Sequence, residues 1–345
     1  MSIDVSVVMP CWNVERWLPR CLDEVFAALP ESAEVIAADD GSTDSTRVIL
    51  EERAAREPRL KVLALPHGGV SSARNAALDV ACGEWVFFVD PDDGVEPDFF
   101  TAMLEAVRGA DADCCVTAMR ERSEDGVFGE ATPLKGDYRF ATNAEIVAGY
   151  LPRIFGYSFD DIRAWYRGNG LFADREMASA CRIVYRRALL EDNRIRFDPE
   201  VELFEDAMFN AEALLAARTM TCVDRPLYRV TSRASGAMRT VPRDAVRYGR
   251  NKLALLAARN RLDAKAGGRL APLYDGTCVL SALELLALRA KGNASQRKEF
   301  AEILDAYLAD ARVASALRAF PLSVRRPLVA AAVLYLRMRI RRRGM

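Results

Sequence analysis

The sequence is poor in the side chains that bind zinc, and this excludes one class of site. Its 345 residues contain a single histidine, His67, and no two of its eight cysteines are separated by two residues. A structural zinc site needs clustered Cys and His ligands at short spacings, so no such site is expected. We expect a reducing, cytoplasmic environment in which the cysteines act mainly as small apolar side chains.

Long hydrophobic runs are also missing. The N-terminal residues MSIDVSVVMP contain no basic segment followed by an apolar run, so no secretory signal is expected. Near the C-terminus, nine apolar residues, Leu328–Leu336, lie between Arg326 and Arg337. A membrane-spanning helix needs about 20 apolar residues, so this segment is too short to cross a bilayer.

The C-terminal segment is strongly basic, whereas the rest of the chain is acidic. From Pro321 to Met345 there are seven arginines and no acid, which leaves a net charge of −8 on the first 320 residues. One hypothesis is an amphipathic helix at the surface of an anionic membrane, with arginines on the lipid head groups. The alternative is a C-terminal helix packed on the protein body. Nucleic acid binding is not expected, because the body is acidic and the tail lacks interleaved aromatic residues.

The first 120 residues alternate short apolar runs with helical patterns. Strands are predicted at Val5–Met9, Glu34–Ala38, Lys61–Leu65, Glu84–Val89 and Asp113–Ala118. This alternation predicts an α/β fold with a mainly parallel sheet flanked by helices. From Arg243 onward the pattern predicts successive helices. We therefore expect a nucleotide-binding half over residues 1–122, a second half over 123–235 and a helical region over 236–345.

Polar residues follow each of the first four predicted strands. The segments are CWN, DDGS, HGG and DPDD, and ligands of parallel sheets bind beyond the carboxyl ends of the strands. The buried run Trp85–Val89 leads directly into Asp90, Asp92 and Asp93. Carboxylates this close repel one another, and a hard cation such as Mg²⁺ or Mn²⁺ would offset that repulsion. A solvated turn is the alternative.

Four motifs in a fixed order extend this interpretation. VSVVMPCWNVERWL, VIAADDGSTDST, GGVSSARNAALDVACGEWVFFVDPDD and the later CRIVYRRALLEDNRIRFDPEV…FEDAMFNAEALL follow one another along the chain. Together they resemble the family 2 glycosyltransferases, nucleotide-sugar-dependent enzymes of the GT-A fold (Rossmann-like) that include enzymes of bacterial surface-polysaccharide synthesis. The resemblance covers Val5–Ala118 and resumes over Ser179–Val230.

The resemblance assigns a set of residues to the nucleotide. They are Pro10, Cys11, Trp12, Asn13, Asp40, Arg74 and Asp90. Trp12 would stack on the base, although the family more often has tyrosine there, and Asp40 would accept the N–H of uracil, without excluding guanine. Arg74 would face the diphosphate, to which arginine binds well. The alternatives are a helix-capping role for most of DDGSTDST and a surface position for Arg74.

The resemblance also implies a metal and a catalytic base. Asp92 would bind Mn²⁺ or Mg²⁺ directly, and Asp90 would contact the ribose or reach the metal through water. Asp206 would take the proton of the acceptor hydroxyl, with its neighbour Glu205 orienting the acceptor or the helix. The alternative for this acidic pair is stabilisation of a helix N-terminus.

We therefore expect an inverting glycosyltransferase that uses a nucleotide-sugar, with a UDP-sugar favoured. Its acceptor would be a hydroxyl of a glycan or lipid-linked molecule in bacterial surface-polysaccharide synthesis, with the enzyme peripheral on the inner face of the membrane; a homodimer stays open. One rival is a non-catalytic binding or scaffold protein of the same fold. Another is a nucleotidyltransferase, which should carry a Gly-rich basic phosphate loop where this chain has PCWNVERW.

Overall fold

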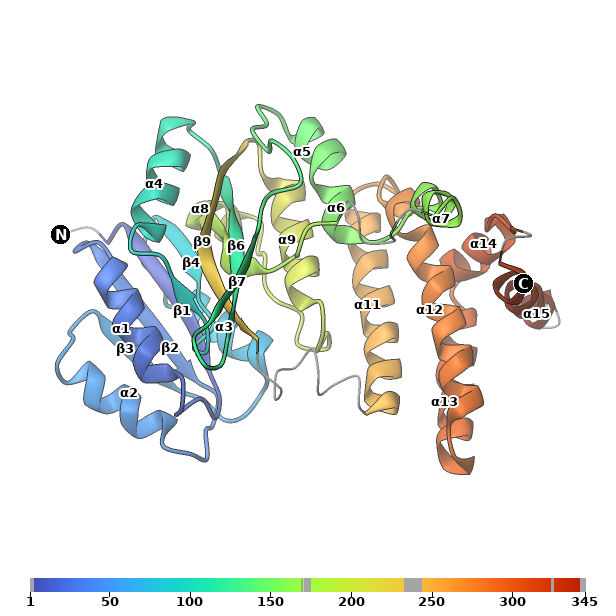
Figure 1. The fold of residues 1–345 in the computed structure, drawn as a ribbon, viewed down its shortest axis with the longest axis horizontal. Helices are drawn as coiled ribbons and strands as arrows, with labels where there is room; N and C mark the ends of the chain where they lie inside the picture. Colours follow the sequence, from blue (N-terminus) through green and yellow to red (C-terminus); the bar gives the residue numbers. More distant parts are fainter. Residues whose placement is uncertain (1–2, 169, 171–174, 233–243, 324–325, 342–345) are drawn as a thin grey trace. The chain divides into compact units, whose positions relative to one another are not determined.

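The computed structural model describes residues 3–168, 170, 175–232, 244–323 and 326–341 (Figure 1). The chain divides into two compact units. Unit 1 comprises Met1–Leu151 and Glu176–Gly236, and unit 2 comprises Pro152–Arg175 and Ala237–Met345.

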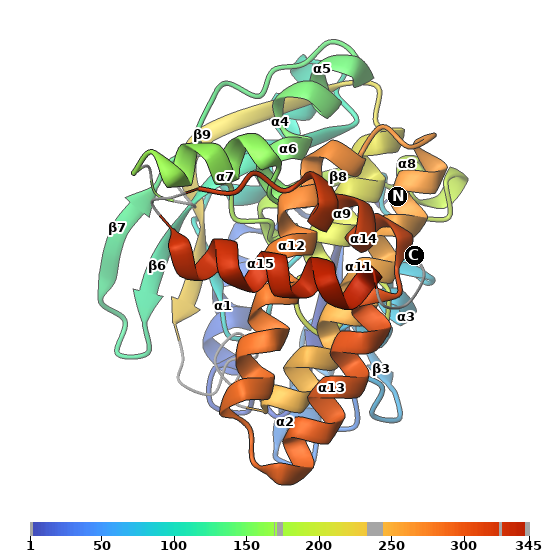
Figure 2. The same cartoon turned by 90° about the vertical axis from the view of Figure 1, so that its right-hand side faces the viewer.

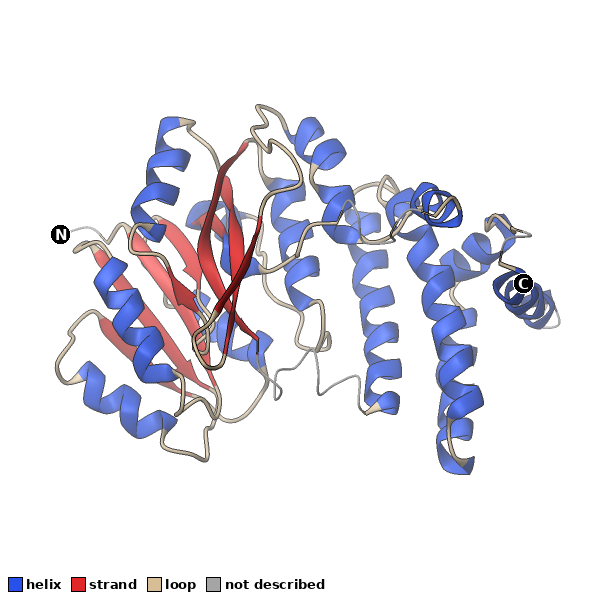
Figure 3. Ribbon diagram, viewed as in Figure 1, coloured by secondary structure: helices blue, strands red, loops and turns tan. Residues whose placement is uncertain are grey.

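Unit 1 is built on a mixed sheet, drawn in red in Figure 3. Its order is β3 (Leu60–Ala64), β2 (Ala33–Asp39), β1 (Val5–Cys11), β4 (Trp85–Phe88), β8 (Ile183–Arg186), β6 (Cys114–Ser123), β9 (Met220–Ser232) and β5 (Gly94–Val95). The first four strands are mutually parallel, and β8 is antiparallel to both β4 and β6. The strand β7 (Phe128–Thr132) forms a hairpin with β6. The predicted α/β fold is confirmed.

Helices pack on both faces of this sheet (Figure 1). They are α1 (Leu18–Ala28), α2 (Thr46–Ala54), α3 (Val70–Leu78), α4 (Phe99–Gly109), α5 (Asn143–Gly149), α8 (Arg187–Asp192) and α9 (Glu205–Ala216), with a 3₁₀ turn at Ala180–Arg182. In α1 the apolar residues recur every three or four positions, so Leu18, Cys21, Leu22 and Val25 all face the interior.

Two adjacent phenylalanines in β4 show how the core is divided. Side chains alternate across a strand, so Phe87 and Phe88 point to opposite faces of the sheet. Phe87 makes edge contacts with Phe99 and Phe100 of α4, at ring-centroid distances of 5.5 and 5.0 Å. Phe88 instead meets Phe209 of α9 at 5.4 Å. Burial of each such ring contributes about 1.5–3 kcal/mol.

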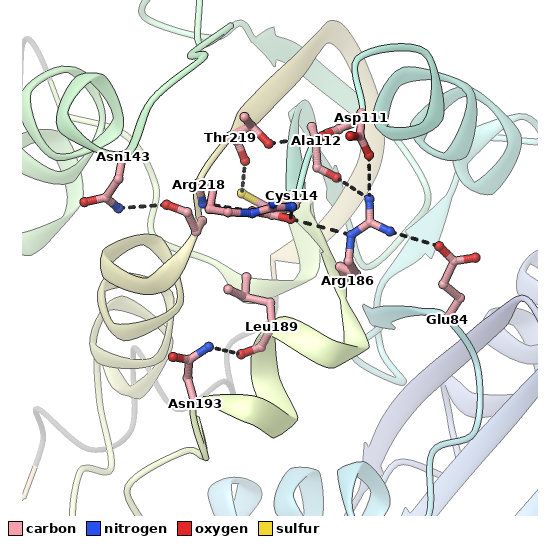
Figure 4. Close-up of polar contacts among 12 residues, drawn as sticks. Glu84, Asp111, Ala112, Cys114, Asn143, Arg186, Leu189, Asn193, Arg218 and Thr219 are labelled. Atoms are coloured by element: carbon pink, nitrogen blue, oxygen red, sulfur yellow. Dashed lines mark hydrogen bonds and ion pairs between the residues drawn. The ribbon is translucent and has the colours of Figure 1, made fainter.

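The end of the sheet where β4 begins is held by Arg186 (Figure 4). Its guanidinium pairs with Glu84 at 3.1 Å and Asp111 at 3.3 Å, and with Asp113 at 3.5 Å. The same guanidinium lies 4.6 Å from the ring centroid of Trp85. These contacts join the starts of β4 and β6, and they leave the opposite strand ends for the polar segments DDGS, HGG and DPDD.

Unit 2 is helical, as the pattern after Arg243 predicts. Its helices are α6 (Leu151–Phe155, from Pro152 on), α7 (Phe159–Tyr166), α11 (Ala245–Lys265), α12 (Ala271–Lys291), α13 (Ala294–Leu308), α14 (Ala311–Ala319) and α15 (Pro327–Arg341). Among the described residues, α12 alone is long and apolar enough to cross a membrane, by length and composition only. About two fifths of its most apolar stretch (39%) is buried within the protein, and core helices pass the same test.

The basic C-terminal helix α15 packs on the rest of unit 2 through one face (Figure 2). That face buries Val333, Leu336 and Ile340. Arg337 donates to the carbonyl oxygens of Leu317 and Phe320, at 2.6 and 2.8 Å. The packed alternative therefore accounts for the face of α15 that carries these three residues.

The opposite face of α15 is exposed and apolar. Its large exposed side chains are Leu328, Leu334, Tyr335 and Met338. Arg339, one of the arginines predicted to meet lipid, instead pairs with Asp305 of α13.

Candidate active site

The first predicted nucleotide-binding segment lies at the carboxyl end of β1. Pro10 and Cys11 are its last, buried residues. Burial raises the pKa of the Cys11 thiol well above its usual value, and the nearby carboxylates of Asp39, Asp90 and Asp92 raise it further. Cys11 is paired with Asp39 in the parallel register of β1 and β2, and β4 pairs with the other side of β1, so the tips of three strands converge.

Asn13 joins the loop after β1 to the loop after β2. It has a φ of 51°, a left-handed conformation that asparagine tolerates better than most residues. Its backbone N–H donates to Ser42 Oγ at 3.1 Å, and its Oδ1 accepts from the Thr43 N–H at 2.8 Å. The Asn13 side chain is thus part of the loop framework, and its contact with a nucleotide stays a prediction.

Trp12 and Asp40 share a partner, His67. The rings of Trp12 and His67 are stacked, with centroids 4.6 Å apart and an interplanar angle of 19°. His67 Nδ1 also lies 2.9 Å from Asp40 Oδ2. Trp12 is 50% exposed, so the stack still leaves aromatic surface for a flat ligand.

The carboxylate of Asp40 is buried and well supplied with donors. Its two oxygens accept from the backbone N–H groups of Gly68 and Gly69, at 2.7 and 2.9 Å. Gly41 allows this close approach: it has a φ of +70°, and a Cβ there would lie 2.9 Å from the backbone nitrogen of His67. Because each carboxylate oxygen can accept two hydrogen bonds, Asp40 keeps capacity for a nucleobase N–H.

Asp39, the acid before Asp40, is bonded to the loop that follows β2. Its oxygens accept from the backbone N–H of Ser42 at 3.2 Å and from Arg47 at 3.1 Å. Both partners belong to the segment between β2 and the first turn of α2, so Asp39 fixes the loop next to Asp40.

The DPDD segment forms a tight turn after β4. The Asp93 N–H donates to the carbonyl oxygen of Asp90 at 3.0 Å. The Asp90 side chain is 32% exposed, whereas Asp92 and Asp93 are only 7% and 5% exposed. Burial raises the pKa of Asp93 well above its usual value, and the charges of Asp92 and Asp90 raise it further. The turn therefore concentrates negative potential at the strand tips.

Residues from distant segments hold this turn in place. Thr231 of β9 donates its N–H to Asp93 Oδ1 at 2.7 Å, and Arg20 of α1 donates to the carbonyl oxygen of Asp92 at 3.0 Å. Gly94 packs so closely against Glu24 and Arg122 that a Cβ would collide with both side chains.

The predicted base lies at the N-terminus of α9. The preceding residue, Phe204, has a φ of 65°, an unusual conformation for a bulky side chain and one found often at functional sites. Asp206 Oδ2 accepts from the Ala180 N–H at 3.0 Å. Burial raises the pKa of Asp206, and burial together with the Asp206 charge raises that of Glu205 to about 7.

Arg74 of α3 connects these acids. Its Nη1 lies 2.8 Å from Asp206 Oδ1 and 3.1 Å from Glu205 Oε1, and its Nη2 lies 2.9 Å from Asp90 Oδ1. The side chain is 2% exposed, which rules out the surface alternative. The structure thus brings Asp90, Glu205 and Asp206 together around one cation. The predicted contact between Arg74 and a diphosphate stays a prediction.

The acids of the DPDD turn fit a divalent cation that a diphosphate completes. Among the described residues, no group of three or more His, Cys, Asp or Glu side chains could hold a metal ion on its own. Mg²⁺ typically takes one or two carboxylates together with substrate phosphates, which matches Asp92 and Asp90. Three carboxylates within four residues, two of them buried, place negative charge in this turn that such a cation would relieve.

The sequence interpretation missed several supporting residues. They are His67, Tyr228, Thr231 and Arg20, for which the sequence indicated no role. The hydroxyl of Tyr228 donates to Asp93 and accepts from the Asp90 N–H. Of these residues, only His67 could have been found from the sequence, because its segment, HGG, follows the end of a predicted strand.

Comparison with known proteins identifies relatives of the chain. The model of glycosyl transferase family 2 matches residues 6–165. Among curated relatives, the "uncharacterized glycosyltransferase EpsJ" of Bacillus subtilis is 28% identical over 224 residues, 65% of this chain and 60% of EpsJ. The succinoglycan biosynthesis protein ExoO of Rhizobium meliloti is 28% identical over 212 residues, covering 61% of this chain and 56% of ExoO. The matches thus span less than two thirds of these two relatives.

Solved structures share the fold. S. aureus TarS residues 1–349, in complex with UDP-GlcNAc, superpose with a TM-score of 0.61 at 21% identity, covering 98% of this chain and 92% of that one. The mannosyltransferase PcManGT from Pyrobaculum calidifontis, in complex with GDP-Man and Mn²⁺, gives a TM-score of 0.51 at 15% identity, covering 98% and 88%. The matching family model, the named glycosyltransferase relatives and the shared fold lead to one conclusion: residues 6–165 of the chain match glycosyltransferase family 2, and the chain has the GT-A fold of the TarS structures.

Proposed function

We propose that the protein transfers a sugar from a nucleotide-sugar, with UDP favoured, to a hydroxyl of a glycan or lipid-linked acceptor. One observation carries this proposal: a donor-side acid, Asp90, and the acceptor-side pair Glu205 and Asp206 lie around the single guanidinium of Arg74. Arg74 therefore contacts both the acid proposed for the donor side, Asp90, and the acid that would activate the nucleophile, Asp206.

The donor would be bound by the tips of β1, β2 and β4. Trp12 offers an exposed aromatic face for the base, and Asp40 offers a fixed acceptor for its ring N–H. A UDP ligand is supported by the TarS complex with UDP-GlcNAc, whose fold this chain shares. Asp92 and Asp90 would hold Mn²⁺ or Mg²⁺, which neutralises charge that develops on the leaving diphosphate.

Asp206 would act as the general base. One oxygen is held by the Ala180 N–H and the other by Arg74, so the carboxylate has a defined orientation. In the transfer step it would accept the proton of the acceptor hydroxyl while the oxygen attacks the anomeric carbon and the nucleotide leaves from the opposite face. A single displacement inverts the anomeric centre, so an α-linked donor would give a β-linkage.

A donor panel tests the proposal. The full chain would be incubated with UDP- and GDP-sugars and Mn²⁺, and binding would be followed by thermal shift and by slow hydrolysis of the donor. We expect a UDP-sugar to raise the melting temperature and to be hydrolysed in a metal-dependent manner. Binding without hydrolysis or transfer would favour the scaffold alternative, and release of pyrophosphate would favour a nucleotidyltransferase.

The proposed acceptor and cellular location rest on one curated relative and on the exposed surface of α15. ExoO is a succinoglycan biosynthesis protein, which supports a bacterial surface polysaccharide as the product. An acceptor carried on lipid would place the enzyme at the cytoplasmic face of the membrane, and the exposed apolar face of α15 offers a surface for contact with it.

A further inference from the structure

Arg74 has an unusual set of partners for a residue expected to bind a diphosphate. It joins acids that lie 16, 131 and 132 residues away in the sequence, on the β4 turn and on α9. Both Nη1 hydrogens and one Nη2 hydrogen are used in these contacts. The residue therefore links the donor side of the site to the acceptor side.

We propose that Arg74 is a positioning residue that holds the Asp206 carboxylate in a fixed geometry relative to Asp90. The inference rests on the proposed function, because it assigns to Asp206 the role of base. It adds that the orientation of this base depends on a side chain from α3.

The surroundings of Arg74 make it rigid. Its guanidinium lies 5.0 Å from the ring centroid of Phe197, and that ring stacks on Phe209 with centroids 4.0 Å apart and an interplanar angle of 5°. Phe209 belongs to α9, three residues after Asp206. The stack therefore fixes Arg74 relative to the helix that carries the base.

Arginine is suited to this position in a way that lysine is not. The planar guanidinium presents donors in fixed directions and can meet three carboxylates at once, whereas an ammonium on a flexible stem cannot reproduce that geometry. With Arg74 on Oδ1 and the Ala180 N–H on Oδ2, both oxygens of Asp206 are oriented. Loss of the guanidinium would leave Oδ1 of Asp206 without this donor and let the carboxylate rotate.

A positioning role and a diphosphate contact predict different kinetics. If Arg74 bound the diphosphate, its loss would weaken donor binding. If Arg74 positions Asp206, its loss lowers kcat while the dissociation constant of UDP with Mn²⁺ stays unchanged.

The experiment compares Arg74→Lys with Arg186→Lys. Arg186 pairs with several acids at the opposite end of β4, so its variant controls for the loss of a partly buried guanidinium group. We expect Arg74→Lys to lower kcat by about 100-fold, the cost of a base displaced by about 1 Å, without changing UDP affinity. Arg186→Lys should leave kcat unchanged. A loss of UDP affinity with unchanged kcat in Arg74→Lys would overturn the proposal.

Two further measurements separate positioning from general stability. In an Asp206→Asn background, Arg74→Lys should cause no additional loss of kcat, because the two residues act as a unit. Methylguanidinium added to Arg74→Ala should restore part of kcat without altering the KM for the donor. Losses that multiply in the double variant would contradict the inference.

A measurement that does not depend on catalysis tests the positioning role of Arg74 separately from the proposed function. Hydrogen exchange at the Ala180 amide, which donates to Asp206, should accelerate in Arg74→Lys and not in Arg186→Lys. Unchanged exchange in Arg74→Lys would overturn the positioning role even in an active enzyme. A wild-type chain that binds no nucleotide-sugar would overturn the proposed function, whatever the exchange result.

Discussion

The hydroxyl of Tyr228 lies 2.8 Å from Asp93 Oδ2, although 135 residues separate the two in the sequence. The same hydroxyl accepts from the Asp90 N–H at 3.2 Å. A β9 side chain thus completes the hydrogen bonding of the acidic turn after β4. Asp93 therefore stabilises the turn that carries Asp90 and Asp92, the two residues proposed to hold the metal.

Tyr228→Phe should destabilise unit 1 and weaken donor binding. The substitution leaves the buried Asp93 carboxylate and the Asp90 N–H with one partner fewer, at a cost of about 1–3 kcal/mol. Tyr138→Phe is the matched control, because that buried hydroxyl donates to Glu176 at 2.7 Å. We expect chemical denaturation to show a loss for both variants and UDP titration with Mn²⁺ to show weaker binding for Tyr228→Phe only. Equal UDP affinity in the two variants would contradict the supporting role of Tyr228.

Asp92→Ala and Asp206→Ala should separate binding from catalysis. Asp92 is assigned to the metal that holds the diphosphate, so its loss should weaken UDP binding and remove the dependence of that binding on Mn²⁺. Asp206 is assigned to proton removal, so its loss should spare UDP binding and lower the transfer rate by a factor of about 10²–10⁴. Calorimetric titration and a transfer assay on the same preparations check both. Intact turnover in Asp206→Ala would refute the assignment of the base.

The parallel half of the sheet could be predicted because its signals are local. Every residue of β1 and β2 is buried, and the apolar runs Val7–Met9 and Val35–Ala38 indicate the two strands, each with a turn at its end. The position of β8 could not be predicted. It lies between β4 and β6 and pairs antiparallel with both, although about 60 or more residues separate it from either strand. Periodicity carries no information about such pairings.

The candidate site also has a part that could be predicted from the sequence and a part that could not. The acids at the strand ends and at the start of α9 could be predicted from motifs and from the rule that parallel strands present their carboxyl ends together. The ion pairs of Arg74 could not, because they depend on how α9 packs against α3. His67 was overlooked because the role of a histidine in a loop depends on its contacts in the folded protein, which here are with Trp12 and Asp40.

The activity should depend on pH through Asp206. The base must be unprotonated, and burial raises its pKa, so kcat/KM should fall at a higher pH than for an exposed aspartate. Asp90→Asn removes the neighbouring negative charge that raises the pKa of Asp206, so this variant should shift the acidic limb of the profile to lower pH. Glu200→Gln, which replaces an exposed acid in the segment before α9, is the control. An acidic limb that stays in place in Asp90→Asn would contradict the coupling of Asp90 and Asp206.

Trp12 should contribute to nucleotide binding through its ring. Stacking of a base on an aromatic side chain is worth about 1–3 kcal/mol, so Trp12→Ala should weaken UDP binding by about 5- to 150-fold. Trp12→Tyr keeps an aromatic face and should retain most of the affinity. Because Trp12 is half-exposed, neither variant should change the melting temperature much. UDP affinity that is equal in all three proteins would exclude the stacking role.

The exposed face of α15 should mediate binding to anionic membranes. Leu334 and Met338 lie one turn apart and are 48% and 54% exposed, so the double variant Leu334→Glu/Met338→Glu changes this face without touching the buried Val333 and Leu336. A fully buried side chain of this size contributes about 1.5–3 kcal/mol, so partial burial of the two in the lipid interface corresponds to a loss of about tenfold in affinity in the double variant. Sedimentation with vesicles of phosphatidylcholine and phosphatidylglycerol measures the loss. Val48→Glu, at an equally exposed position on α2, should bind vesicles as the wild type does. If the double variant and Val48→Glu sediment alike, the surface of α15 has another partner and the membrane proposal fails.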